Sequence, residues 1–268
     1  MGVAPWRFDD ASRCFVARAG TSRGRGSLTT FVTHVTNIFM KRQTTHEEDW
    51  IALLRGTHEI AETFPDDVVF IGGMAVYLHS VASRAAAPAE RSHDADLYIS
   101  LPAFDDLRST EMVTTNARLR KKQFVKYGME YDVYLEHNHG LIIEFGEIFA
   151  GSVVAEGVRV ASLEHLLLLK LVAFLDRFGT PKGPKDARDV IRIVLLLHQH
   201  GVSRSRLAPH FSTKMADTLK QLSHSKEFVT LTNGNLHEAR KLRDIYTAAA
   251  DSISKQILTA KSPRRRRP

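Results

Sequence analysis

Two aspartates separated by one residue, Asp94 and Asp96, are the strongest candidates for chemistry in this sequence. They begin the run Asp94 to Ser100, which is typical of a strand. Successive side chains of a strand point to opposite faces, so both carboxylates would project from one face, roughly 6 to 7 Å apart. Like charges this close repel one another unless a divalent cation neutralises them, and Mg²⁺ prefers carboxylate oxygens together with substrate phosphates. The spacing therefore predicts a Mg²⁺ (or Mn²⁺) site, although an Asp-x-Asp is also common as a solvated strand edge.

A glycine pair, Gly72 and Gly73, lies about 20 residues before the aspartates. It follows the apolar run Val68 to Ile71 and precedes the helical stretch Met74 to Val81, a pattern of strand, tight turn and helix. Glycines let the backbone approach an anion closely, and the start of a helix offers free N–H groups. A glycine pair alone is more often an ordinary turn. Combined with the aspartate pair, it predicts that a triphosphate binds beside the cation.

Asp132 is the candidate third carboxylate. It lies in a segment of strict polar and apolar alternation, Glu130 to Glu136, which predicts a strand that pairs with Leu141 to Phe145 as a hairpin. In nucleotidyl transfer a third carboxylate can bind a second metal ion or act as a base. Asp132 is therefore a candidate for both roles, and the alternative is an exposed acid on a strand.

Four further residues, Lys170, Arg177, Lys185 and Asp186, are candidates for the nucleotide site, and Lys170 is also a candidate catalytic residue. Lys170 interrupts a leucine-rich run, where a charge is costly unless it reaches an anion or the edge of the core. Arg177 follows on the same helical face. Lys185 and Asp186 open the next helix, and Asp189 shares a face with Asp186 near its N-terminus. A snorkelling lysine and N-terminal capping acids are the alternatives.

These residues must be positioned by strands and helices that alternate through the first half of the chain. Beyond Val160 the pattern is wholly helical, with Ser162 as the cap of the first helix there. The expected elements are helices over Glu47 to Phe64, Phe104 to Lys122, Leu163 to Phe178 and Asp186 to His200, with further helices to about Lys255. The predicted fold class is α+β: a mixed sheet flanked by helices, followed by a C-terminal helical domain. The expected divisions are a weakly ordered basic arm (1–45), a core (46–160), a helical domain (161–255) and a basic tail (256–268).

The net charge of +7 is concentrated at the two ends of the chain. Residues 1–45 hold seven Lys/Arg and two acids, and residues 252–268 hold six Lys/Arg and no acid, so the remainder is mildly acidic. Solvated basic ends and salt-sensitive attraction to nucleic acid are both compatible with this distribution. Met40 is a candidate alternative start.

The localisation expected from the sequence is cytoplasmic. Cys14 is the only cysteine, so no intramolecular disulfide can form. The longest apolar run is too short to cross a bilayer, and the N-terminal residues lack the apolar core of a secretory signal. No membrane association is expected.

Three blocks resemble the minimal nucleotidyltransferase superfamily and, within it, the AbiEii-type abortive-infection toxins and their bacterial relatives. The resemblance covers about Val68 to Leu197. Its blocks are Val68 to His79 with the glycine pair, Arg91 to Leu97 with Ser92 and the aspartate pair, and Leu166 to Asp189 with Lys170, Arg177, Lys185, Asp186 and Asp189.

The resemblance implies a nucleotidyltransferase fold with Mg²⁺ at Asp94 and Asp96. It implies that Gly72, Gly73 and Ser92 bind a nucleoside triphosphate such as ATP. A nucleoside monophosphate would pass to a hydroxyl and pyrophosphate would leave. In toxin members the acceptor is a tRNA 3′ end or another cellular molecule, and a cognate antitoxin protein is the partner.

Two other functions remain open at this stage. A protein of the same fold that has lost turnover could act by binding nucleotide or RNA. Hydrolysis of phosphodiesters needs only that water replace the acceptor hydroxyl. An Asp132 carboxylate on the same face as Asp94 and Asp96 favours the enzyme, and one that points away favours the binding protein.

Overall fold

The computed structural model describes residues 47–83, 89–116, 121–136 and 141–261. The predicted basic arm, with Cys14 and Met40, and residues 262–268 of the tail lie outside the described residues. The described residues belong to one compact unit, and one hydrophobic core runs through the sheet and the helices.

The described strands form one mixed sheet in the order β3-β4-β5-β2-β1-β7-β6. β2 is central, antiparallel to β1 and parallel to β5, while β1 and β7 are also parallel. The strands are β1 (Val68–Ile71), β2 (Asp94–Ile99), β3 (Thr114–Asn116), β4 (Lys121–Lys126), β5 (Met129–Leu135), β6 (Val153–Ala155) and β7 (Val158–Val160).

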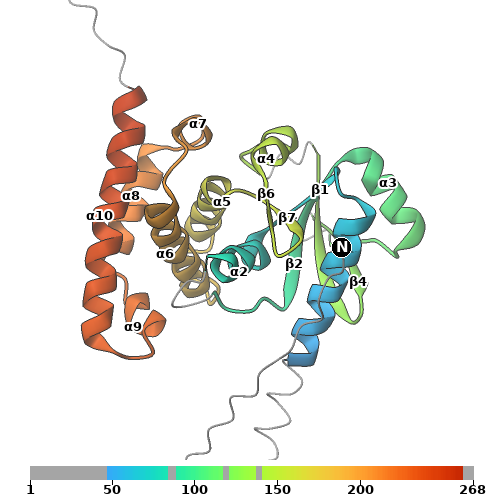
Figure 1. Cartoon of the computed structure of the whole chain (residues 1–268), viewed down its shortest axis with the longest axis horizontal. Coiled ribbons are helices and arrows are strands. Elements are labelled where there is room, and N and C mark those ends of the chain that lie inside the picture. Colours follow the sequence, from blue (N-terminus) through green and yellow to red (C-terminus); the bar gives the residue numbers. More distant parts are fainter. Residues whose placement is uncertain (1–46, 84–88, 117–120, 137–140, 262–268) are drawn as a thin grey trace, which may run out of the picture. The chain divides into compact units, whose positions relative to one another are not determined.

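Helices flank this sheet, and the helices of the C-terminal half form a group at one side of it (Figure 1). α2 packs on β1 and β2, α5 and α6 pack against α2, and α10 packs against α6 on the side away from the sheet. The helices are 47–63, α2 (Gly72–Ala82), α3 (Leu101–Thr110), α4 (Phe145–Gly151), α5 (Leu163–Asp176), α6 (Gly183–His200), α7 (Arg204–Leu207), α8 (Thr213–Leu222), α9 (Glu227–Leu231) and α10 (Leu236–Lys261). The predicted class, a mixed sheet flanked by helices with helices at the C-terminal end, is confirmed.

Local signals account for the elements that carry the candidate residues. The Ser162 hydroxyl accepts a hydrogen bond from the His165 amide and caps α5, as predicted. Tyr131 of β5 is fully buried, and its hydroxyl donates to the Leu53 carbonyl in the helix 47–63 at 2.8 Å. Because strand side chains alternate, Asp132 points to the opposite face of the sheet from that helix.

Two expectations for secondary structure were wrong. The stretch Phe104 to Lys122 is not one helix, because α3 ends at Thr110 and the chain continues into β3 and β4. Threonines in that segment favour a strand over a helix.

The predicted hairpin partner of β5 was also wrong, because β5 pairs with β4 and not with Leu141 to Phe145. Tyr127 and Gly128 form a two-residue turn with φ of 54° and 78° between β4 and β5. Positive φ at both positions matches the hairpin turn that glycine favours, but tyrosine at the first position obscured it in the sequence.

No helix in the described part of the chain is long and apolar enough to cross a membrane.

Candidate functional site

Asp94 and Asp96 lie on one face of β2, as the alternation of the strand predicted. Both side chains are partly buried. The hydroxyl of Ser92 is buried and donates to Asp94 Oδ1 at 2.7 Å. Ser92, predicted as a nucleotide contact, therefore orients one of the two carboxylates in this structure.

Asp132 lies in register with Asp96 on the neighbouring parallel strand β5, so the two side chains share a face. The carboxylate of Asp132 is buried and has its own partners. Lys121 of β4 forms an ion pair with Oδ2, and the Gln123 amide donates to Oδ1 at 2.9 Å. The third carboxylate is thus on the face expected for the enzyme, and two side chains of β4 hold it.

Gly72 begins α2 directly beside Asp96. Its φ is +71°, a left-handed conformation that glycine adopts without strain. A Cβ added to Gly72 would lie 2.0 Å from Asp96 Oδ2, so the carboxylate fills the space that a side chain would need. A Cβ at Gly73 would lie 3.1 Å from the Ser92 hydroxyl and 3.6 Å from Lys185 Nζ. The N-terminal amides of a helix, a lysine and the carboxylate pair therefore converge at one place.

Lys170 is buried on α5 and pairs with acids of α6. Its Nζ lies 2.8 Å from Asp189 Oδ2 and 3.8 Å from Asp186 Oδ1. Arg177 Nε lies 3.1 Å from Asp186 Oδ2. The two acids are nearly fully buried and hold both cations, so they position positive charge beside the site. Lys170 also acts on Asp96, whose pKa it lowers against stronger opposing effects.

The two carboxylates of β2 differ in their electrostatic environment. Burial, followed by the charge of Asp94, raises the pKa of Asp96 to about 6. Burial also disfavours ionisation of Asp94, but the Ser92 hydroxyl and the charges of Lys185 and Lys182 outweigh it, so its pKa is below the ordinary value. Repulsion within the pair therefore acts mainly on Asp96.

Sequence reasoning did not identify Lys121, Gln123, Tyr134 or Lys182. The Tyr134 hydroxyl donates to Asp96 Oδ1 at 3.4 Å, and burial together with the charge of Asp96 raises the pKa of the phenol. Tyr134 is two residues after Asp132 on the same strand, so the alternation could have indicated that it shares the face of that carboxylate. The assignment of Lys121 to a helix concealed its position opposite Asp132.

The carboxylate face fits a divalent cation in part. Two carboxylates lie on one strand face, and the pKa of one of them is raised. A bound cation would reduce the repulsion between their charges. However, within the described ranges no three His, Cys, Asp or Glu side chains lie together as a metal site. Asp94 and Asp96 are therefore the candidate ligands in this arrangement, and Asp132 could join them only by exchanging Lys121 for the ion.

Comparison with known proteins gives distant likenesses only. No protein-family model matches the sequence, and no curated protein matches it. Among solved structures, an antigenic nucleotidyltransferase-like protein from Paracoccidioides brasiliensis is 16% identical, with coverage of 68% of this chain and 92% of that chain and a TM-score of 0.47. JHP933 from Helicobacter pylori is 16% identical, with coverage of 79% and 94% and a TM-score of 0.44. The antibiotic-resistance factor ANT(2'')-Ia is 12% identical, with coverage of 76% and 94% and a TM-score of 0.35. These TM-scores are all below 0.5, so the function has to be argued from the side chains of the site.

Proposed function

We propose that this chain is a nucleotidyltransferase that moves a nucleoside monophosphate from a nucleoside triphosphate to a hydroxyl acceptor. The observation that carries the proposal is the contact between Gly72 and Asp96, where an added Cβ would lie 2.0 Å from the carboxylate. It brings the free amides at the start of α2 to the same point as two carboxylates. Helix amides bind phosphate oxygens, and paired carboxylates bind the divalent cation that accompanies a triphosphate.

In this proposal the residues of the chain divide into phosphate-binding and cation-binding groups. Asp94 and Asp96 would hold Mg²⁺, which would supply positive charge for the phosphates and the departing pyrophosphate. The amides of Gly72 and Gly73 and the ammonium group of Lys185 bind phosphate oxygens. Lys170 supplies positive charge that acts on Asp96.

The transfer forms one bond and breaks one. The acceptor oxygen bonds to the α-phosphorus, the bond from that phosphorus to the bridging oxygen breaks, and pyrophosphate departs. The proton of the acceptor hydroxyl passes to a carboxylate, for which Asp132 is the candidate once Lys121 has released it. We propose an RNA 3′ end as the acceptor, by the toxin resemblance of the sequence, and a cognate antitoxin as the protein partner.

Transfer of label from each α-labelled nucleoside triphosphate to total bacterial RNA and protein, with Mg²⁺, tests the proposal. The test variant is Asp94→Asn/Asp96→Asn, which keeps the shape of both side chains. Asp105→Asn is the matched control, because Asp105 lies on α3 and is exposed. Label that depends on the pair but not on Asp105 supports transfer. Label that persists in the double variant contradicts it.

A binding protein without turnover is the second candidate, and one observation favours it. Lys121 and Gln123 already occupy both oxygens of Asp132. If these contacts persist with nucleotide bound, Asp132 can neither bind a metal ion nor accept a proton. Equilibrium binding of a nucleoside triphosphate by folded protein, with no label on RNA or protein, would select this candidate.

A further inference from the structure

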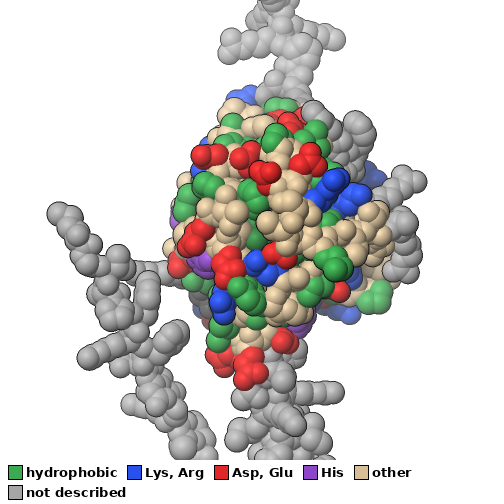
Figure 2. Space-filling model, turned by 90° about the vertical axis from the view of Figure 1, so that its right-hand side faces the viewer, with side chains coloured by type: hydrophobic (Ala, Val, Ile, Leu, Met, Phe, Trp, Pro, Cys, Tyr) green, Lys and Arg blue, Asp and Glu red, His purple; other side chains and the backbone are tan. Residues whose placement is uncertain are grey.

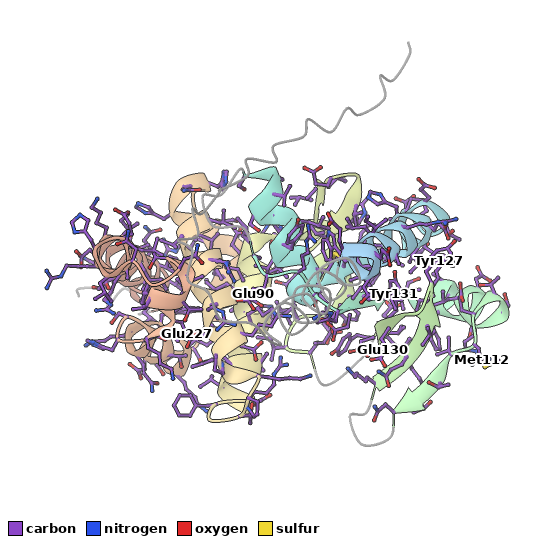
Figure 3. All side chains as sticks on the ribbon, turned by 90° about the horizontal axis from the view of Figure 1, so that it is seen from below. Glu90, Met112, Tyr127, Glu130, Tyr131 and Glu227 are labelled. Atoms are coloured by element: carbon purple, nitrogen blue, oxygen red, sulfur yellow. The ribbon has the colours of Figure 1, made fainter. Side chains whose placement is uncertain are left out.

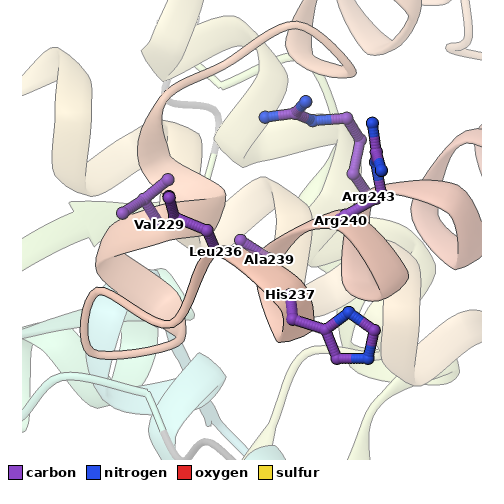
Figure 4. A pocket seen from close by; sticks show the side chains of 6 residues that line it. All are labelled: Val229, Leu236, His237, Ala239, Arg240 and Arg243. Atoms are coloured by element: carbon purple, nitrogen blue, oxygen red, sulfur yellow. The ribbon is translucent and has the colours of Figure 1, made fainter.

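An open pocket of about 360 Å³ lies between α9 and the first turns of α10 (Figure 4). It lies on the helical side of the fold, since α9 and α10 pack against α6 on the side away from the sheet (Figure 1). Its lining residues are Val229, Leu236, His237, Ala239, Arg240 and Arg243. The pocket therefore combines two arginines and a histidine with a small apolar wall.

The two arginines of this pocket have no acidic partner in the described part of the chain. Two nearby cations, by contrast, are paired: Arg188 of α6 lies 2.5 Å from Glu227, and Lys241 of α10 lies 3.1 Å from Glu238. Arg240 and Arg243 are three residues apart, so they share a helix face. Figure 4 draws both guanidinium groups extending to the same side of α10. Two unpaired cations on one face attract an anion.

Arg243 is held in place by packing. Its guanidinium lies over the ring of Phe228, 5.5 Å from the centroid. Its Nε is buried and has no hydrogen-bond acceptor among the residues described. A planar guanidinium of fixed orientation presents its N–H groups in a fork that matches phosphate oxygens, and less entropy is lost when it binds. Arg240 is exposed, so it supplies a second donor group at the mouth of the pocket.

We propose that this pocket binds a phosphate group of a single-stranded polynucleotide. The volume exceeds that of one phosphate, and Val229, Leu236 and Ala239 offer apolar surface to the attached sugar. Acidic side chains are spread over the opposite face of the described unit, where basic ones form only small groups (Figure 2). A polynucleotide would therefore approach from the side of α9 and α10.

This site goes beyond the proposed transfer and does not depend on it. It lies across α6 from the carboxylates, and binding can be measured without a nucleoside triphosphate or a metal ion. Anisotropy of a fluorescein-labelled 12-nucleotide single-stranded RNA, measured with the full chain over a range of salt concentrations, is the experiment. The variants are Arg240→Gln, Arg240→Gln/Arg243→Gln and the matched control Lys241→Gln, which removes one positive charge from the same helix.

We expect Arg240→Gln to weaken binding about tenfold and the double variant to weaken it further, with Lys241→Gln close to the wild type. The salt dependence of log K should become shallower by about 0.7 for each lost phosphate contact. Arg240 is exposed, so its single variant tests binding even if loss of the Arg243 stacking unfolds α9. Equal affinity in Arg240→Gln and wild type, or equal losses in Arg240→Gln and Lys241→Gln, would overturn the proposal. Displacement of the RNA by inorganic phosphate at matched phosphate concentration would also overturn it, because it would show a site for small anions.

Discussion

Replacement of Gly72 by alanine tests the contact on which the proposed function depends. Two separate penalties arise. The first is the left-handed backbone, with φ of +71°, which costs a residue with a Cβ about 1 to 2 kcal/mol. The second is the collision of the new Cβ with Asp96 Oδ2 at 2.0 Å, which forces the carboxylate out of its rotamer for about 0.5 to 1.5 kcal/mol more. The free energy of unfolding should fall by about 1.5 to 3.5 kcal/mol in total.

Gly128→Ala separates the two penalties. Gly128 has a φ of +78°, and a Cβ there would meet no described atom within 4 Å. This variant carries the backbone penalty alone, about 1 to 2 kcal/mol. Urea unfolding of both variants therefore measures the collision with Asp96 as the difference between them. In the label-transfer assay Gly72→Ala should lose about 100-fold or more, because Asp96 is displaced, while Gly128→Ala keeps its activity.

One combination of results would refute this reasoning. If Gly72→Ala and Gly128→Ala lose equal stability, and Gly72→Ala keeps full transfer activity, then Asp96 does not need the space beside Gly72. The start of α2 and the carboxylates would then not form a single site.

Three further predictions concern charge. Without divalent ions, the raised pKa of Asp96, about 6 instead of 3.8, should lower the wild-type free energy of unfolding as pH rises from 4 through 6, by up to about 3 kcal/mol. Asp96→Asn should lack this component and be the more stable protein at pH 7.5 in urea unfolding; a parallel pH dependence in both would contradict it. Arg188→Met leaves the buried Glu227 without its cation and Glu90 with Arg192 alone, at 3.8 Å, and should cost about 3 kcal/mol. Arg108→Met, at an exposed pair, should cost under about 1 kcal/mol. Lys121→Met should tighten Mn²⁺ binding about tenfold in a titration followed by electron paramagnetic resonance, because the lysine no longer competes for Asp132; weaker binding would count against that role.

The bridge made by Arg188 joins segments that are far apart in the sequence. Glu90 precedes β2 and Glu227 begins α9, and Figure 3 labels both. Arg188 donates to both carboxylate oxygens of Glu90, from Nε to Oε1 and from Nη2 to Oε2 at 3.0 Å, and its Nη1 lies 2.5 Å from Glu227 Oε2. The bidentate geometry ties the segment before the carboxylate strand to the helical half. No local pattern in the sequence could indicate this bridge, because its three members lie in three separate segments of the chain.

The sequence was informative where a local pattern decides the geometry. Alternation along β2 predicted that Asp94 and Asp96 share a face, and the glycine pair predicted the turn from β1 into α2. Alternation also predicted Asp132 as the third carboxylate. Its register with Asp96 could not be predicted, because β2 and β5 are neighbours only after the chain has folded back through α3, β3 and β4.

Lys170 illustrates the limit of pattern reasoning. A lysine within a leucine-rich helix was predicted to reach a phosphate, and that role remains a prediction. The structure gives Lys170 a nearer set of partners, because α5 and α6 pack closely and bring Asp189 to 2.8 Å and Asp186 to 3.8 Å. The pairing depends on the packing of two helices, which the sequence of either helix alone does not determine.

The difference between Asp94 and Asp96 arises from tertiary contacts alone. Both residues are aspartates on the same face of the same strand, so nothing in the local sequence pattern distinguishes them. Asp94 has the Ser92 hydroxyl and nearby lysines, which hold its pKa below the ordinary value, while burial and the charge of Asp94 raise that of Asp96. A cation bound between them would act mainly on Asp96, since its ionised form is the less stable of the two. Loss of the Ser92 hydroxyl should therefore raise the pKa of Asp94 and weaken cation binding, although no cation ligand is removed. This result would distinguish a serine that orients Asp94 from a serine that contacts the nucleotide.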